Sequence, residues 1–432
     1  MKQPWGCLKI VAVVPLVLIV AVFARYKWSN ISPAVSFPTP LPTPSSNGFD
    51  LYVKAAKLID PGRLPVDEVY DREALNLTPA EKAQRYSLRR KQEWLTTNAA
   101  GFNLMRQALA AQARHPDTRG QLTPMVEYGK MRELARYKVV ESKTLQQEKR
   151  WRAAVEARLD VMEMGGDIMR GGGLIAGLVG IACEAIALNE FDPLVAHLNA
   201  TECRQVNARL EKILAARPLF SEIMTEEKYS SQQMLLNQWA RIDQGDVQEK
   251  DEDEDAAEDE PDLFSVNAQF WLSMLVSRRK TIANNEKLLN QVIAESDKPL
   301  RQRQPVPPPS KYFDVVNFII YPVMDRALFN STRSLAGPQR QQLRLALREY
   351  RLEKGTYPPS LQQLVPGYLK KLPIDPYGSG QIWHYKKLND SYRAWSIGPD
   401  GKDNDGTPIL LKKGKTRVVI WTDSLGDVVA RP

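Results

Sequence analysis

The chain has 432 residues, a formal net charge of +8, and 43% hydrophobic and 25% charged residues. This composition is that of a globular protein with room for two or three domains, and it excludes a chain that is disordered throughout. The basic excess comes without zinc-finger spacing, a basic zipper or an aromatic-interleaved basic strand, so we expect no nucleic-acid partner.

The first predicted element is a membrane anchor at residues 1–28. An uncharged run rich in Val, Leu and Ile extends from Ile10 to Ala24, and a basic and aromatic collar follows it. This pattern is typical of a transmembrane helix. It predicts a single-pass protein of the cell inner membrane, with the bulk of the chain extracytoplasmic, in the periplasm. A secretory signal peptide with its cleavage site near Ala24 is the alternative.

Two segments of different character follow. Residues 29–47 contain five prolines among many Ser and Thr residues, a composition that predicts a stiff, extended stalk. Residues 48–245 have a helical pattern almost throughout, which predicts a helical, solenoid-like domain. In it, Thr78-Pro79-Ala80-Glu81 has the composition of a capped helix start, and that helix could run toward Ala113.

A glycine-rich stretch lies in the middle of the helical domain. Gly171-Gly172-Gly173 is followed by Gly177 and Gly180. No strand precedes these glycines, and the Lys-Ser/Thr ending of a phosphate-binding loop is missing. We therefore predict a turn followed by a closely packed helix.

Side chains that often carry catalysis are few and scattered. His115, His197 and His384 are isolated from one another, and no metalloprotease motif surrounds them. Cys183 and Cys203 lie in predicted helices, where buried free thiols are more common than a disulfide. These patterns predict a protein that is not an enzyme.

The helical domain is followed by two linkers. Residues 246–262 hold eleven carboxylates against one lysine, and such a self-repelling run predicts an acidic disordered linker. Residues 263–310 return to a helical pattern and end in a proline-rich break, so we assign them as a helix and a linker before the last domain, 311–432.

The last domain combines a long helix with short strands. The helical pattern of residues 313–353 ends at Gly355, the expected left-handed cap, and Gly337-Pro338 should bend or interrupt it. Strand-like runs follow at 382–387, 392–397, 417–421 and 428–430. The pattern predicts a long helix followed by short strands.

Four sequence pieces in this domain occur in a familiar order: LREYRLEKGTYPPSLQQL, YLKKLPIDPYG, YRAWSIGPDGKDNDG and GDVVARP. Over about residues 330–432 the chain resembles the globular domain of the type II secretion system major pseudopilins. The resemblance implies a pilin-like domain in which a long helix leads into a small antiparallel sheet. It also implies that an acidic loop near the end of the chain binds calcium.

The residues that match this loop are Asp400, Asp403 and Asp405, and Asp427 matches the carboxylate of the closing strand. Hard oxygen ligands in a glycine-bearing loop suit Ca²⁺, which accepts irregular geometry. A bound Ca²⁺ would have a structural role, fastening the last strand to the loop. A solvated Asp/Gly turn without metal is the alternative.

Together these predictions describe an α+β protein with an N-terminal transmembrane helix, a mainly helical middle domain and a C-terminal pilin-like domain. We expect a non-enzymatic protein of secretion or envelope assembly, with other envelope or secretion proteins as partners and with the membrane bound through its N-terminal helix. The alternative is an envelope enzyme with an unrecognised active site in the helical domain. A buried charged pocket with perturbed carboxylates would favour the enzyme, and a smooth apolar groove would favour protein binding.

Overall fold

The computed structural model of this protein describes most of the chain. The described residues are 31–60, 62, 78–117, 119–120, 125–244, 277–310, 314–410 and 420–432. The predicted membrane anchor at 1–28 and the predicted acidic linker at 246–262 lie outside these ranges.

The structure does not support the predicted transmembrane helix. Among the described residues, no helix is both long enough and apolar enough to cross a membrane. The very apolar helix Leu174–Leu188, for example, has 15 residues, whereas a membrane span needs about 20. The transmembrane helix is therefore removed from the fold class. The predicted single-pass location in the inner membrane is withdrawn with it.

The described part of the chain is mostly helical, with one small sheet. The helices are α2 (Gly48–Leu58), α3 (Pro79–Arg85), α4 (Leu88–Thr97), α5 (Ala99–Ala110), α6 (Met125–Gln147), α7 (Trp151–Met169), α8 (Leu174–Leu188), α9 (Asp192–Val195), α10 (Ala200–Ala216), α11 (Phe220–Asp243), α13 (Arg278–Ser296) and α14 (Val315–Lys354). Two 3₁₀ turns, η2 (Leu300–Gln302) and η3 (Leu361–Leu364), and three strands, β1 (His384–Lys387), β2 (Tyr392–Ser396) and β3 (Val428–Ala430), complete the fold.

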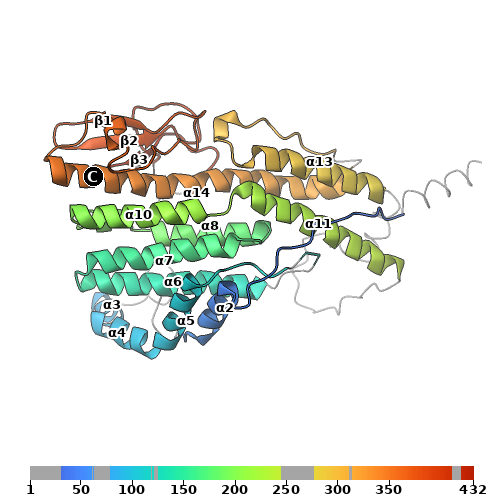
Figure 1. Ribbon diagram of the computed structural model, residues 1–432, viewed down its shortest axis with the longest axis horizontal. Coiled ribbons are helices and arrows are strands. Elements are labelled where there is room, and N and C mark those ends of the chain that lie inside the picture. The colour runs from blue at the N-terminus through green and yellow to red at the C-terminus, as the bar shows by residue number, and fades with distance from the viewer. Residues whose placement is uncertain are drawn as a thin grey trace, which may run out of the picture.

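The helices stack side by side in layers (Figure 1). α2, α4 and α5 lie at one edge beside α6, and α7, α8 and α10 form the middle of the stack. α14 packs on α10 and α8, and it carries the sheet on its other side. The helical layers and the sheet are thus joined by one helix.

The helix start predicted at Thr78 is confirmed, but the long helix predicted after it is wrong. The Thr78 side chain accepts the Glu81 N–H, and the Glu81 carboxylate accepts the Thr78 N–H at 2.8 Å. The chain then breaks into α3, α4 and α5. At the second break the Asn98 side chain accepts the Asp60 N–H at 2.8 Å and donates to the Asp60 carbonyl at 3.1 Å. This contact with a distant residue stabilises the break between the helices. Local helix propensity contains no information about it.

The predicted glycine turn and the closely packed helix after it are confirmed. The chain turns at Gly171, which has a positive φ of 77°, and α8 begins at Leu174. Farther along α8, a Cβ atom at Gly180 would lie 2.4 Å from the carbonyl oxygen of Gly165 on α7. Only glycine allows the two helix backbones to approach this closely.

The sheet has the strand order β1-β2-β3, and both pairs are antiparallel. His384 pairs with Trp395 across β1 and β2, and Ala394 pairs with Ala430 across β2 and β3. The predicted strands at 382–387 and 392–397 are present in slightly shorter form, and the strand at 428–430 has the predicted bounds. Most of the strand predicted at 417–421 falls on residues that the structure does not describe.

Helix α14 contributes to three hydrophobic clusters. Leu345 packs in the cluster of the helical layers, whereas Leu343 and Leu347 pack with the sheet. Nearer its start, Leu328 packs with α8, α11 and α13. The helix continues through Pro338, where the sequence predicts a bend or break. Neighbours on both sides hold it, so packing outweighs the local cost of the proline.

The described part of the proline-rich segment, residues 31–47, lies against the helical layers. Arg119 donates to the Pro38 carbonyl at 2.6 Å, and Arg278 of α13 donates to the Ser32 hydroxyl at 3.2 Å. The Phe37 ring meets the Tyr229 ring of α11 edge to face. These contacts place the segment on the surface of the helical layers, where it covers part of them.

Candidate anion-binding pocket

The acidic loop predicted to bind calcium is closed by hydrogen bonds from N–H groups. The Asp427 carboxylate is buried and accepts the backbone N–H of Gly406 at 2.8 Å and of Asn404 at 3.1 Å. Asp400 accepts the Gly426 N–H at 3.1 Å and the Asn404 side-chain amide at 3.2 Å. Burial raises the pKa of Asp427, and these donors offset only part of the rise. For Asp400 burial also acts to raise the pKa, but the N–H donors together bring it below its ordinary value.

The other two predicted ligands face the sheet. Asp403 accepts the Trp395 indole N–H at 2.8 Å and lies 3.4 Å from the His384 ring nitrogen. Asp405 is exposed, and its carboxylate lies 3.7 Å from the Lys386 ammonium of β1. The four aspartates therefore divide between the inside of the loop and the face of the sheet.

This arrangement does not fit a metal ion. In the part of the chain that the structure describes, no group of three or more His, Cys, Asp or Glu side chains is placed to hold one. Ca²⁺ needs six to eight oxygen ligands around one point, whereas the carboxylates of Asp400 and Asp427 accept N–H groups of the loop. Calcium binding stays a prediction that rests on the resemblance.

The two described cysteines are free thiols. Cys183 and Cys203 are both buried, and burial raises the pKa of each to about 12. They are therefore protonated at neutral pH and behave as small apolar side chains.

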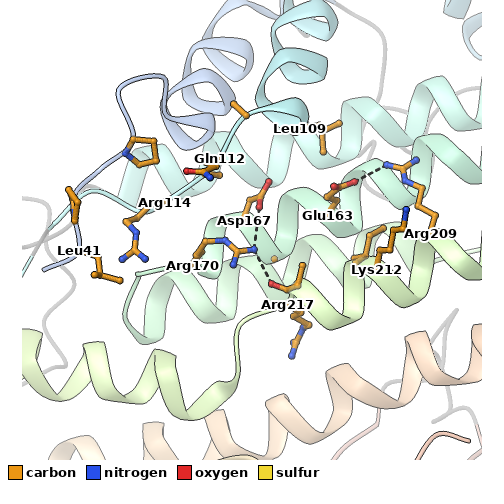
Figure 2. Close-up of a pocket in the computed structure, with 17 residues that line it drawn as sticks. Leu41, Leu109, Gln112, Arg114, Glu163, Asp167, Arg170, Arg209, Lys212 and Arg217 are labelled. Carbon is orange, nitrogen blue, oxygen red and sulfur yellow. Dashed lines mark hydrogen bonds and ion pairs between the residues drawn. The ribbon is translucent and has the colours of Figure 1, made fainter. Parts of the chain in front are cut away.

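A charged pocket of about 790 Å³ lies where α7 and α10 meet the end of α5 and the proline-rich segment (Figure 2). We call it the α7–α10 pocket. Its basic lining residues are Arg114, Arg170, Arg209, Lys212 and Arg217, and its acidic ones are Glu163 and Asp167. Its volume is in the range of pockets that hold small molecules.

Two of the five basic residues are neutralised by carboxylates of their own. Arg209 of α10 bonds three α7 carboxylates, those of Glu156, Asp160 and Glu163, at 2.5, 2.6 and 2.9 Å. Arg217 bonds both oxygens of Glu184 at 2.7 and 3.1 Å. These arginines hold helices together and contribute little free positive charge to the pocket.

Arg170 is engaged at the end of α7. It donates to the Ala216 carbonyl of α10 at 2.9 Å and lies 3.7 Å from the Asp167 carboxylate. Figure 2 shows Asp167 and Arg170 side by side in the middle of the pocket. The carbonyl at the end of α10 thus fixes the guanidinium next to Asp167.

Arg114 and Lys212 differ from the other basic residues. Within the described part of the chain, neither side chain has a hydrogen bond or ion pair. The backbone of Arg114 is nevertheless fixed, because buried Asn47 accepts its N–H at 2.9 Å and donates to its carbonyl at 2.8 Å. The Arg114 side chain passes along Gly171, where a Cβ atom would lie 3.2 Å from its Cγ. Both residues are thus available to a negatively charged ligand.

Asp167 is the titratable group at the centre of the pocket. Its carboxylate accepts the hydroxyl of buried Tyr52 at 2.8 Å. Burial raises the pKa of Asp167 to about 6, although Tyr52 and Arg170 act to lower it. Burial and the neighbouring Asp167 also raise the pKa of Tyr52. The carboxyl group can therefore gain or lose a proton near neutral pH.

Sequence reasoning missed this pocket. On α10 the spacing of Arg209, Lys212 and Ala216 places them on one helix face, which is a weak signal. Arg114 carries no comparable signal, because it follows α5 and reaches the pocket only when α2 and the proline-rich segment fold against α7.

The comparisons with known proteins give no independent guide to this site. No family model, curated protein or solved structure matches the chain. The pseudopilin resemblance of residues 330–432 therefore stays a prediction, and the function has to be argued from the site itself.

Proposed function

We propose that this protein binds a small organic anion in the α7–α10 pocket. The observation that carries the proposal is the pair of basic side chains, Arg114 and Lys212, that face the pocket without a partner in the described part of the chain. Arg114 is half-buried, and a partly desolvated cation attracts an anion more strongly than one in open solvent, whereas Lys212 is exposed. Apolar side chains, among them Leu109 and Ile213, suit the organic part of such a ligand.

The same pocket supports the enzyme alternative as a second candidate. It is charged, and the raised pKa of Asp167 is the kind of perturbation expected of a general acid or base. Asp167 lies next to Arg170, which could hold the acidic group of a substrate near the carboxyl. In this form the protein would bind the anion and exchange a proton with it. Secretion- or envelope-assembly-associated protein binding stays a prediction from the resemblance alone.

The proposal is tested by calorimetric titration of the full chain with inorganic phosphate and with short carboxylates such as succinate. We expect saturable binding that weakens about tenfold in Arg114→Gln and in Lys212→Gln, since each loses a charge-assisted hydrogen bond. Arg90→Gln is the matched control, because Arg90 is exposed on α4, outside the pocket. Absence of binding, or equal binding by all variants, would contradict the proposal.

A further inference from the structure

Asp167 presents one of its two carboxylate oxygens to the α7–α10 pocket. Buried Tyr52 donates its hydroxyl to Oδ2 at 2.8 Å. Oδ1 lies 3.7 Å from the nearest guanidinium nitrogen of Arg170, which is longer than a hydrogen bond. In the part of the chain that the structure describes, Oδ1 accepts no hydrogen bond. A ligand that enters the pocket therefore meets Oδ1 as an acceptor without a donor.

Two arginines gather at the same end of α7. His115 donates its backbone N–H to the Arg170 carbonyl at 2.8 Å, which fixes the neighbouring Arg114 beside the helix end. The Arg114 guanidinium lies over Gly171, where a Cβ atom would be 3.3 Å from its Nη1. In Figure 2, Arg170 lies between Arg114 and Asp167. An acidic group held by these two arginines would therefore lie beside Asp167.

The acidic surroundings of Asp167 oppose such a group. Glu163, one turn earlier on α7, also lines the pocket and is paired with Arg209. The end of α7, where Asp167 lies, carries partial negative charge of its own. Tyr52 of α2 keeps its proton, because burial and Asp167 raise the pKa of its hydroxyl. An anion therefore faces an ionised Asp167 at a helix end that is already negative.

The other basic groups near Asp167 do little to offset this repulsion. Arg209 and Arg217 of α10 are bonded to carboxylates, and Lys212 is exposed. His115 bonds the Tyr128 hydroxyl at 2.8 Å, and burial lowers the pKa of its ring, so it is neutral at pH 7. Only Arg114 and Arg170 remain to hold an anion at this end of the pocket.

A proton on Asp167 removes the conflict. The protonated oxygen becomes a hydrogen-bond donor, which can bond an oxygen of the ligand instead of repelling it. Arg170 is then no longer attracted to the carboxylate. Its bond to the Ala216 carbonyl uses one of its five N–H groups, so others are available to the anion.

From this geometry we propose that the pocket binds its anion together with one proton from solvent, held on Oδ1 of Asp167 and shared with the ligand in a hydrogen bond. The inference rests on the proposed function and states how pH regulates that site. The pKa of Asp167, about 6 because of burial, means that the proton is gained at little cost near neutral pH.

The experiment is calorimetric titration of the full chain with sulfate from pH 6 to pH 9 and with succinate from pH 7 to pH 9, ranges in which the charge of each anion is constant. We expect the affinity to fall about tenfold for each pH unit above 7, as the protonated fraction of Asp167 falls. At pH 8, titrations in buffers of different ionisation enthalpy should show uptake of about one proton per bound anion.

Asp167→Asn separates this coupling from other effects of pH. Its amide is neutral at every pH and offers an N–H donor in place of the carboxyl proton. The variant should bind sulfate with the same affinity from pH 7 to pH 9, and at pH 9 about tenfold or more tightly than the parent protein. Misfolding cannot produce such a gain. Asp50→Asn, exposed on α2 and outside the pocket, should keep the pH dependence of the parent.

Each outcome decides between the two claims. Binding that does not change with pH and takes up no proton overturns the inference and leaves anion binding standing. A fall in affinity that Asp167→Asn shares equally overturns it as well, because another group then titrates. If neither sulfate nor succinate binds at any pH tested, the inference is wrong. If inorganic phosphate also fails to bind, the proposed function fails with it.

Discussion

The acidic loop around Asp400 and the α7–α10 pocket are both rich in charge, yet their charges are neutralised in different ways. In the loop, backbone and side-chain N–H groups donate hydrogen bonds to the inner carboxylates of Asp400 and Asp427. In the pocket, Arg209 and Arg217 are paired, whereas Arg114 and Lys212 are not paired within the described residues. A charge that is satisfied by its own chain supports the fold, and a charge left unsatisfied in a cavity is available to a ligand. This contrast, rather than the number of charged residues, identifies the candidate site.

The largest change in stability is expected when an inner carboxylate of the loop is removed. Asp427→Ala removes the acceptor of two backbone N–H groups while leaving them in a buried loop. We expect a loss of about 3 kcal/mol in the free energy of unfolding, measured by urea denaturation. Asp390→Ala, in the exposed turn between β1 and β2, is the control and should cost less than about 0.5 kcal/mol. Equal effects of the two substitutions would show that the N–H network does not stabilise the loop.

A smaller change in the free energy of unfolding, of opposite sign, is expected from a substitution in the pocket. The pKa of Asp167 is about 6 in the folded protein and near 4 in an unfolded chain. Between these values the folded state holds the proton that the unfolded state has released. Its contribution to stability is therefore full below about pH 4 and is lost as the pH rises through 6. Asp167→Asn should avoid this loss. At pH 8 its free energy of unfolding should exceed that of the parent protein by about 2 kcal/mol.

The measurement is urea denaturation of both proteins at pH 4 and pH 8, because the difference between them isolates Asp167 from other titrating groups. At pH 4 the two should be nearly equal. Asp50→Asn, exposed on α2, controls for the loss of one surface carboxylate. An Asp167→Asn protein whose advantage does not change with pH would show that burial does not perturb this carboxyl.

The smallest change in stability is expected when calcium is added. The pseudopilin resemblance predicts that Ca²⁺ raises the melting temperature, whereas the described loop predicts no change, because N–H donors already occupy the inner carboxylates. We expect the second result for the full chain in millimolar calcium chloride against EDTA. A rise in melting temperature that Asp400→Ala abolishes would instead establish the metal site and show that the loop rearranges around it.

Local patterns in the sequence predicted much of the fold. The capping box at Thr78, the turn at Gly171 and the strands β1 and β2 each depend on residues close together in the chain. The breaks between α3, α4 and α5 were missed because a distant residue, Asp60, holds one of them. The continuation of α14 through Pro338 without a break was missed for a similar reason, since packing on both sides overrides the local signal.

The site itself was less predictable. Sequence reasoning placed Asp400 and Asp427 near one another, and the structure places both around Asn404. It could not tell a carboxylate that binds N–H groups from one that binds a metal, because both need the same residues. The α7–α10 pocket depends on Arg114 and Lys212, which lie about a hundred residues apart and meet only through the packing of α7. No local pattern contains that information.

Helix α14 has a consequence for how the molecule unfolds. Leu345 belongs to the core of the helical layers, and its neighbours Leu343 and Leu347 belong to the core of the sheet. Arg204 of α10 also bonds Glu349 of α14 at 2.7 Å. A fragment that begins at α14 would expose Leu345 and leave the buried Glu349 carboxylate without Arg204. We therefore expect the two predicted domains to melt in one cooperative transition, with hydrogen exchange equally slow in α10 and α14, rather than as independent folding units.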